Sequence, residues 1–222
     1  MQVNAAKWGW FYRSCREILR AFLRLFGSLE TRGLENFPVT GSAIIACNHV
    51  SYLDPPTVAC AVKRRMRYMA KIELFKYQMT TWFLLRWGVF PVKRGEVDLD
   101  SIRLAIDILK RGEALVLFPE GTRSRDGSLG SAGAGIGMLA KRSGAMVVPT
   151  ALIGTEKVLA PDAKHFSRAK RIVVFGKPLS YKDFAKDLPD HEARIMFGEA
   201  IMEEIRQLLE ANGRPVPAKT EA

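Results

Sequence analysis

The segment SAIIACNHVSYLDPP, residues 42–56, passes from an apolar run through a polar turn to a pair of prolines. The run 42–47 has the length and apolar character of a buried strand, and Asp54 followed by Pro55 is an ordinary start for a helix. A strand, a polar turn and a helix together form the unit of a sheet with helices on its faces. His49 and Asp54 are therefore expected at the carboxyl edge of a strand, where open α/β sheets bind their ligands.

The rest of the chain repeats this alternation, which predicts an α/β fold with a mostly parallel or mixed central sheet flanked by helices. The expected strands are 30–34, 42–47, 67–70, 114–118, 146–150 and 171–176. The expected helices beyond the N-terminal region are 56–63, 73–86, 99–111, 134–143 and 191–211. Since no repeat or low-complexity linker interrupts the pattern, we expect one domain over residues 29–212 and a flexible tail over 213–222.

Two segments within this pattern contain prolines that should interrupt regular structure. GVFPVKRG, residues 88–95, is expected to end a helix and turn through Pro91 towards Lys93 and Arg94. VVPT, residues 147–150, is expected to be a buried strand whose proline stops ladder pairing. The glycine run SLGSAGAGIG does not keep the GxGxxG spacing of a nucleotide loop, and close packing of helices explains it better.

The composition favours an anionic partner. The 222 residues include 34 Lys and Arg against 23 Asp and Glu, a net charge of +11, which would attract nucleic acid, a membrane surface or a phosphorylated substrate. The basic run KRRMR, residues 63–67, lacks the interleaved aromatics of a single-strand binder, and a rim for anionic head groups or carriers explains it as well. We therefore expect no nucleic-acid partner.

Cysteine and histidine usage indicates a reducing compartment without a metal site. The three cysteines lack the CxxC spacing of a zinc site or a disulfide framework. His165 and His191 have no cysteine or carboxylate nearby at metal-ligand spacing. We expect neither a metal nor another cofactor.

Residues 5–27 predict an amphipathic helix. Four arginines at spacings of three and four share one face, while an aromatic and aliphatic face lies opposite; the residues expected at a membrane are Arg13, Arg16, Arg20, Arg24, Phe22 and Phe26. This pattern is typical of a helix lying in a membrane surface, although a helix docked on the core would show a similar apolar face. Because no apolar run approaches the ~20 residues of a span, residues 1–28 are expected to hold the protein on the cytoplasmic face of a membrane without crossing it.

The spacing of His49 and Asp54 allows two interpretations. On one continuous helix a five-residue step would place the side chains ~140° apart, so a hydrogen bond between them requires a turn, which Asp54-Pro55 could supply. The pair is then either a catalytic base with its orienting carboxylate or a polar turn in which Asp54 only starts the helix.

A second segment, LFPEGTRSRDG at residues 117–127, delivers polar residues into a loop at the end of a strand. The guanidinium of Arg123 matches two phosphate oxygens, and Glu120 could orient it or accept a hydrogen bond from a substrate hydroxyl. The alternative is a polar loop with an incidental ion pair.

Taken in order, these segments resemble the lysophosphatidic acid acyltransferase family, also called 1-acyl-sn-glycerol-3-phosphate acyltransferases. That family carries an NHxSxxD block, a block that runs from a glycine through a phenylalanine to an arginine, an FPEGTRS block and an apolar block that ends in proline. The corresponding segments here are 48–54, 88–94, 118–124 and 147–149. HxxxxD alone is a weak signal, but HxxxxD followed at the right distance by FPEGTRS is highly specific.

The resemblance implies transfer of a fatty acyl group from a thioester of coenzyme A or acyl carrier protein to the sn-2 hydroxyl of lysophosphatidic acid, giving phosphatidic acid. It makes His49 the general base on that hydroxyl, while Asp54 fixes the tautomer and stabilises the imidazolium. Direct attack needs no acyl-enzyme, so Ser51 is interpreted as a turn or capping residue.

The resemblance also implies an acceptor site. Its expected residues are Glu120, Gly121, Thr122 and Arg123 around the glycerol phosphate, with Arg94 as a second phosphate contact. Family members commonly have a lysine where Gly133 stands here, which leaves the acceptor head group open.

Three classes of function account for part of this sequence. A membrane-surface acyltransferase accounts for both signature segments and the basic helix, with lysophosphatidic acid, another lysophospholipid or another amphiphile as acceptor. A non-catalytic lipid-binding protein of the same fold would need neither His49 nor Asp54, and a nucleic-acid-binding protein would account for the charge alone. The sequence therefore favours the acyltransferase.

Overall fold

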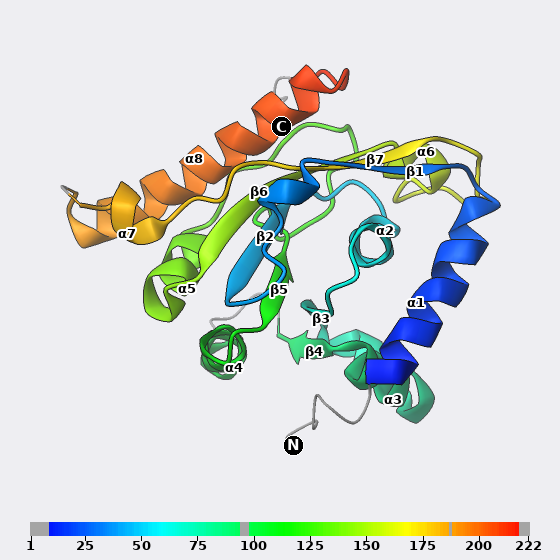
Figure 1. The fold of residues 1–222 in the computed structure, drawn as a ribbon, viewed down its shortest axis with the longest axis horizontal. Helices are drawn as coiled ribbons and strands as arrows, with labels where there is room; N and C mark the ends of the chain where they lie inside the picture. Colours follow the sequence, from blue (N-terminus) through cyan, green and yellow to red (C-terminus); the bar gives the residue numbers. More distant parts are fainter. Residues whose placement is uncertain (1–8, 94–97, 187, 218–222) are drawn as a thin grey trace.

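The computed structural model describes residues 9–93, 98–186 and 188–217, and in this part of the chain seven strands form one mixed sheet (Figure 1). The strands are β1 (Leu29–Arg32), β2 (Ala43–Cys47), β3 (Met66–Lys71), β4 (Val89–Val92), β5 (Ala114–Leu117), β6 (Met146–Ile153) and β7 (Arg171–Phe175). Their order across the sheet is β1-β7-β6-β2-β5-β3-β4. All neighbours are parallel except β6 and β7, which run antiparallel.

Helices cover both faces of this sheet. They are α1 (Gly9–Arg24), α2 (Asp54–Ala61), α3 (Gln78–Trp87), α4 (Leu99–Lys110), α5 (Gly135–Ser143), α6 (Thr155–Val158), α7 (Tyr181–Phe184) and α8 (Asp190–Ala211), with short 3-10 helices η2 (Leu34–Asn36) and η3 (Ile72–Phe75). One core layer packs α4, α5 and α8 against the sheet, and the other packs α1, α2 and α3.

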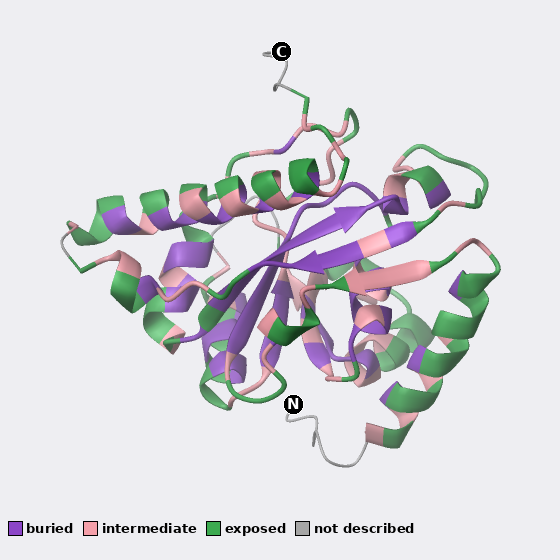
Figure 2. Cartoon of the chain, turned by 45° about the horizontal axis from the view of Figure 1, so that its top comes forward, coloured by how far each residue is buried: buried purple, intermediate pink, exposed green. Residues whose placement is uncertain are grey.

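The central strand β2 shows why the sheet needs both layers. All five of its residues are buried, and alternate side chains enter opposite cores: Ile44 contributes to the layer under α4, α5 and α8, whereas Ile45 contributes to the layer under α1, α2 and α3. Figure 2 shows the same pattern, with buried central strands and helices whose outer sides are exposed. Burial on both faces explains why these strands are continuous apolar runs in the sequence.

The predicted α/β fold is confirmed, and each of the six expected strands is present. The N-terminal helix is confirmed over Gly9–Arg24, and the expected helix 73–86 is divided into η3 and α3. The segment after α3 was predicted wrongly: it does not turn through Pro91 but forms the edge strand β4, in which Pro91 pairs with Ala70. A proline is tolerated there because an edge strand has a neighbour on one side only.

The expectation that Pro149 stops ladder pairing was also wrong. β6 continues to Ile153, and Thr150 pairs with both Cys47 and Phe175. The carbonyl of Pro149 accepts a hydrogen bond from Gly176 N at 2.8 Å. The N–H and C=O groups of one strand residue point towards the same neighbouring strand. The N–H that Pro149 lacks would therefore face the end of β7, where its absence removes little of the hydrogen-bond ladder.

The basic run KRRMR serves the fold in the structure. Arg64 donates hydrogen bonds to the carbonyls of Pro38 at 2.6 Å and Gly112 at 2.9 Å, and Arg67 pairs with Glu113 at 2.6 Å. The guanidinium groups of Arg64 and Arg67 therefore bond to the loops that precede β2 and β5, and they do not form a free rim for anions.

Close packing of α5 on α8 requires a glycine, as the glycine-rich sequence suggested. A Cβ atom on Gly137 would lie 2.5 Å from the carbonyl oxygen of Arg194, whereas a Cβ on Gly135 would meet nothing within 4 Å. The two helices therefore approach more closely at Gly137 than any side chain allows.

We expect Gly137→Ala to lower the free energy of unfolding by about 1–3 kcal/mol, because α8 must move away from α5. Gly135→Ala on the same helix is the matched control and should be neutral or stabilising by up to ~1 kcal/mol. Urea-induced unfolding measures both, and equal stability of the two variants would contradict the close approach.

Candidate active site

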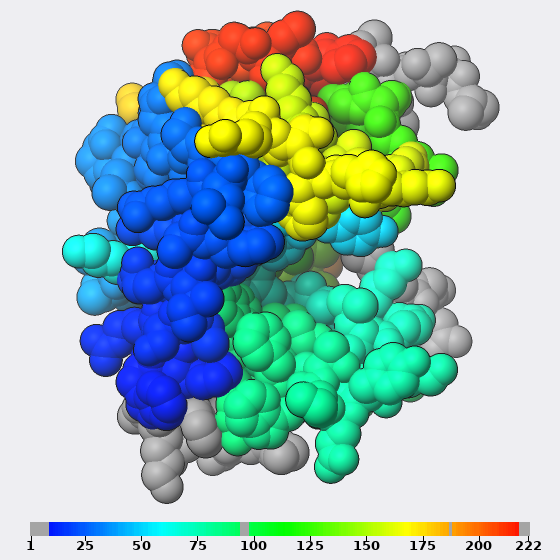
Figure 3. All heavy atoms as spheres, turned by 90° about the vertical axis from the view of Figure 1, so that its right-hand side faces the viewer, coloured from blue at the N-terminus to red at the C-terminus, as the bar shows by residue number. Residues whose placement is uncertain are grey.

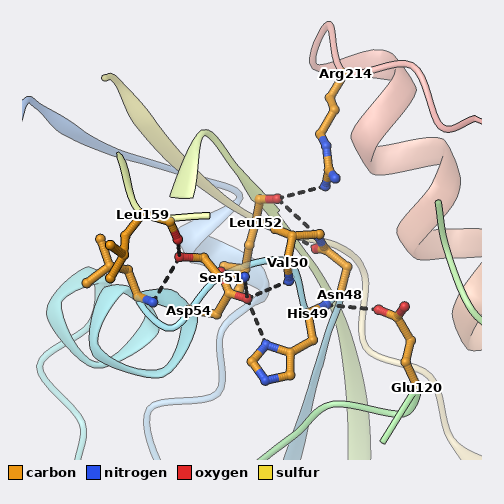
Figure 4. A network of polar contacts seen from close by, with 10 residues as sticks. Asn48, His49, Val50, Ser51, Asp54, Glu120, Leu152, Leu159 and Arg214 are labelled. Atoms are coloured by element: carbon orange, nitrogen blue, oxygen red, sulfur yellow. Dashed lines mark hydrogen bonds and ion pairs between the residues drawn. The ribbon is translucent and has the colours of Figure 1, made fainter. Parts of the chain in front are cut away.

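A buried carboxylate organises the turn between β2 and α2. Asp54 Oδ2 lies 2.8 Å from His49 Nδ1 and accepts the backbone N–H groups of Val50 at 2.7 Å and Ser51 at 2.8 Å (Figure 4). Asp54 is fully buried and His49 is 6% exposed. The chain thus makes the turn that a hydrogen bond between these two side chains requires.

The same geometry decides between the two interpretations of Asp54. α2 begins at Asp54, its N-cap is Leu53, and no side chain caps the helix. The carboxylate of Asp54 instead points back to the preceding turn, whereas a capping side chain accepts N–H groups further into the helix. Asp54 therefore orients His49 and holds the turn.

The backbone and ring of His49 are held from the neighbouring strand as well. His49 N donates to Glu120 Oε1 at 2.9 Å, and His49 O accepts from Ser124 N at 2.8 Å. Phe118, which follows β5, stacks on the imidazole with 4.0 Å between ring centroids. Because β2 and β5 are adjacent and parallel, their carboxyl ends place these two loops side by side.

The remaining ring nitrogen, Nε2 of His49, accepts or donates no hydrogen bond within the described part of the chain. A carboxylate against Nδ1 favours the tautomer in which Nδ1 carries the proton, so the lone pair lies on Nε2. This arrangement can take a proton from a hydroxyl placed at Nε2.

Two polar residues of the turn have structural roles. Asn48 Nδ2 donates to Leu152 O at 3.1 Å and Asn48 Oδ1 accepts from Leu152 N at 2.7 Å, which joins the turn to β6. Ser51 Oγ donates to Leu159 O at 2.5 Å and accepts from Leu53 N at 3.0 Å. The interpretation of Ser51 as a turn residue is consistent with these bonds, whereas Asn48 was not singled out from the sequence.

Glu120 lies differently from the expectation. Besides His49 N, its carboxylate accepts Gly130 N at 3.0 Å through Oε2, and it makes no ion pair with Arg123. Burial raises the pKa of the Glu120 carboxyl, and the two N–H groups act against this rise. The glutamate therefore joins the loop after β5 both to the turn at His49 and to the loop at Gly130.

The expected phosphate contacts lie in the same loop. The guanidinium carbon of Arg123 lies 3.9 Å from the centre of the Tyr52 ring, three residues beyond His49. No described carboxylate pairs with Arg123. Gly121 and Thr122 are exposed, and Arg94 lies outside the described residues. A cation without a carboxylate partner is thus held beside the turn that carries the histidine.

Among the described residues, no three His, Cys, Asp or Glu side chains lie together so that they could hold a metal ion.

Comparison with known proteins gives a consistent result. A family model described as Acyltransferase matches residues 28–153. A protein of Bacillus subtilis named 1-acyl-sn-glycerol-3-phosphate acyltransferase is 33% identical over 199 residues, which cover 89% of this chain and 96% of that protein. The chloroplastic 1-acyl-sn-glycerol-3-phosphate acyltransferase LPAT1 of Arabidopsis thaliana is 31% identical over 180 residues, 79% of this chain and 50% of that protein.

A solved structure shares the fold. The crystal structure of the 1-acyl-sn-glycerophosphate (LPA) acyltransferase PlsC from Thermotoga maritima superimposes with a TM-score of 0.77 at 26% sequence identity. The match covers 99% of this chain and 86% of the other. The region matched by the family model includes both His49 and the loop after β5.

Proposed function

Because this chain belongs to the 1-acyl-sn-glycerol-3-phosphate acyltransferase family, we propose that His49 activates the free hydroxyl of a lysophosphatidic acid for acyl transfer. The chain is an O-acyltransferase, and the reaction of its family produces phosphatidic acid. The observation that carries the proposal is the 2.8 Å contact between His49 Nδ1 and the buried Asp54, which leaves Nε2 available.

The reaction proceeds by direct attack. Nε2 of His49 takes the proton of the sn-2 hydroxyl while the oxygen adds to the thioester carbonyl, and Asp54 stabilises the imidazolium that forms. When the tetrahedral intermediate collapses, the C–S bond breaks and the departing thiolate takes the proton from the imidazolium. Acyl-coenzyme A and acyl carrier protein supply the same thioester, so both are donors in this proposal. Ser51 forms no acyl-enzyme, because its hydroxyl already bonds Leu159 O.

The acceptor phosphate binds at the loop after β5. Arg123 presents a planar guanidinium beside the turn of His49, and Thr122 adds a hydroxyl. Gly121 shapes this loop, since its N–H donates to Phe118 O at 3.0 Å. Arg94 remains a predicted second contact. Glu120 acts as a positioning residue, since both its oxygens accept backbone N–H groups.

We further propose that α1 and α3 attach the enzyme to a membrane surface. None of the described helices combines the length and apolar character of a membrane span. Yet α1 exposes Ile18 and Phe22, Leu25 is exposed directly after α1, and α3 exposes Trp82 and Phe83. Figure 3 shows both helices on one face of the molecule, α1 in blue and α3 in blue-green. Such a face, with basic residues beside it, is typical of a protein that lies on a bilayer.

The four arginines predicted for the membrane divide into two groups. Arg13, Arg20 and Arg24 are exposed on α1. Arg16 is 7% exposed and donates to Val62 O at 3.1 Å and Lys63 O at 2.8 Å, so it packs α1 on the protein. Phe26 is half-buried and contacts Phe166 at 4.7 Å between ring centroids. We therefore assign the electrostatic attraction to the three exposed arginines.

We expect His49→Ala to lower the turnover number by ~10² to 10⁴, the usual worth of a positioned base, and Asp54→Asn to come close to it. Ser51→Ala is the control, which should retain turnover while the free energy of unfolding falls by about 1–3 kcal/mol. Release of the free thiol at saturating substrates measures turnover. More than about a tenth of wild-type turnover in His49→Ala would remove the pair from the mechanism.

Arg123→Lys keeps the charge but loses the planar fork, so KM for the phosphorylated acceptor should rise on the order of tenfold, while KM for the thioester stays nearly constant. Tyr52→Phe keeps the ring beneath Arg123 and should leave both constants near wild type. Steady-state kinetics with each substrate varied separately measures this difference. Equal increases in both constants would count against the assignment of Arg123.

Replacing Ile18 and Leu25 by serine should weaken binding to neutral phosphatidylcholine vesicles at least about tenfold, because apolar area can no longer enter the bilayer. The matched control replaces Ile195 and Met196 by serine on α8, across the sheet, where the exposed fractions are 37% and 38%. Co-sedimentation measures both, and equal binding of the two double variants would rule out α1 as the membrane contact.

A further inference from the structure

A basic cavity lies beside the carboxyl end of α1, apart from the proposed active site. Its volume is about 390 Å³, within the ~300–1,000 Å³ of small-molecule sites. Four arginines line it, namely Arg20, Arg24, Arg168 and Arg171, and the described lining includes no Asp or Glu. None of the lining residues belongs to the turn of His49 or the loop of Arg123.

Arg171 is the buried member of this group, with none of its surface exposed. Its Nη2 donates to Leu23 O at 2.7 Å and Gly27 O at 2.8 Å, which caps the end of α1. Its Nε and Nη1 have no hydrogen-bond partner among the residues that the structure describes. A buried guanidinium without a counterion is unfavourable, and the cap accounts for only one of its three nitrogens. The unpaired groups indicate an anion.

The nearby carboxylates do not supply that anion. Glu17 pairs with Arg16 at 2.6 Å, and Glu30 pairs with Arg32 at 2.6 Å and Lys170 at 2.5 Å. Arg20, Arg24 and Arg168 make no ion pair within the described ranges, and all three are exposed at the cavity. The cavity therefore combines one buried and three exposed cations that form no ion pair with a described carboxylate, although Glu17 lies within electrostatic reach of Arg20 and Arg24.

We propose that this cavity binds the phosphate of an anionic membrane phospholipid, most tightly when the phosphate is a monoester. A monoester carries about −1.5 to −2 charges at neutral pH and three strong acceptor oxygens, which match several guanidinium groups. The lipid source follows from the position of the cavity: Arg24 is followed by the exposed Leu25, and the yellow segment before β7 lies against the same end of α1 (Figure 3). This inference rests on the membrane attachment proposed above.

The test compares vesicles of phosphatidylcholine that contain either phosphatidic acid or phosphatidylserine at equal surface potential. Wild-type protein should bind the phosphatidic acid vesicles on the order of tenfold more tightly, the worth of one charge-assisted hydrogen bond. The double variant Arg24→Gln, Arg168→Gln should lose this preference for phosphatidic acid vesicles over phosphatidylserine vesicles. The control variant Arg13→Gln, Arg103→Gln, which also removes two exposed arginines, should keep it. All four positions are exposed, so folding is preserved, and circular dichroism checks this.

Two outcomes would overturn the inference. An equal ratio in the cavity variant and the control variant would mean that the cavity does not select phosphatidic acid. Inorganic phosphate is also added at the concentration of the accessible lipid phosphate. If the wild-type protein then no longer prefers phosphatidic acid vesicles, the ligand is free phosphate and not a lipid. Thiol release is measured on the same wild-type preparation. If no thiol is released but the preference for phosphatidic acid vesicles is present, the proposed catalysis is refuted and the cavity proposal stands. If thiol is released but the preference is absent, the cavity proposal alone is refuted.

Discussion

One oxygen atom, Oδ2 of Asp54, holds together the turn between β2 and α2. It faces three donors at 2.7 to 2.8 Å, the imidazole of His49 and the backbone N–H groups of Val50 and Ser51. A buried carboxylate is stabilised by hydrogen bonds, and here all three go to Oδ2, whereas Oδ1 is buried without a partner among the described residues. Because two of the three donors are backbone N–H groups, the orientation of the imidazole is tied to the backbone conformation of the turn.

The sheet extends this constraint to the loop after β5. β2 and β5 are parallel neighbours, so the turn after one and the loop after the other emerge at the same edge. Glu120 then joins them by accepting N–H groups from His49 and Gly130, and Ser124 N closes a second bond to His49 O. Because the loop that carries Arg123 is hydrogen-bonded to His49, the separation of the imidazole from this loop is set by these backbone groups.

The fold and the contact between His49 and Asp54 were largely predictable, because strands buried on both faces are continuous apolar runs and the two signature segments have specific spacing. Misplaced features depended on contacts far apart in the chain. Pro91 suggested a turn, since only the completed sheet shows that its strand is an edge. Glu120 was expected to orient Arg123 or to accept from a substrate hydroxyl, whereas its carboxylate accepts N–H groups 71 and 10 residues away. Arg16 looked like the other basic residues of its helix, because charge alone does not show which guanidinium meets buried carbonyls. Asn48 belongs to the NHxSxxD segment, but nothing in that segment shows that its side chain bonds Leu152 on β6, 104 residues away.

The pairing of β1 with β7 has a consequence for the order of assembly during synthesis. β1 bonds only to β7 in the described sheet, and its partner residues follow roughly 140 positions later in the chain. On the ribosome, the first helix and strand therefore emerge long before the edge that receives them, while the central strands can already associate. Through this interval α1 can already pack on α3, because Phe11 contacts Trp82 and Tyr12 contacts Trp87. Only the pairing of β1 has to wait for β7, so closing this edge of the sheet would be a late step of folding.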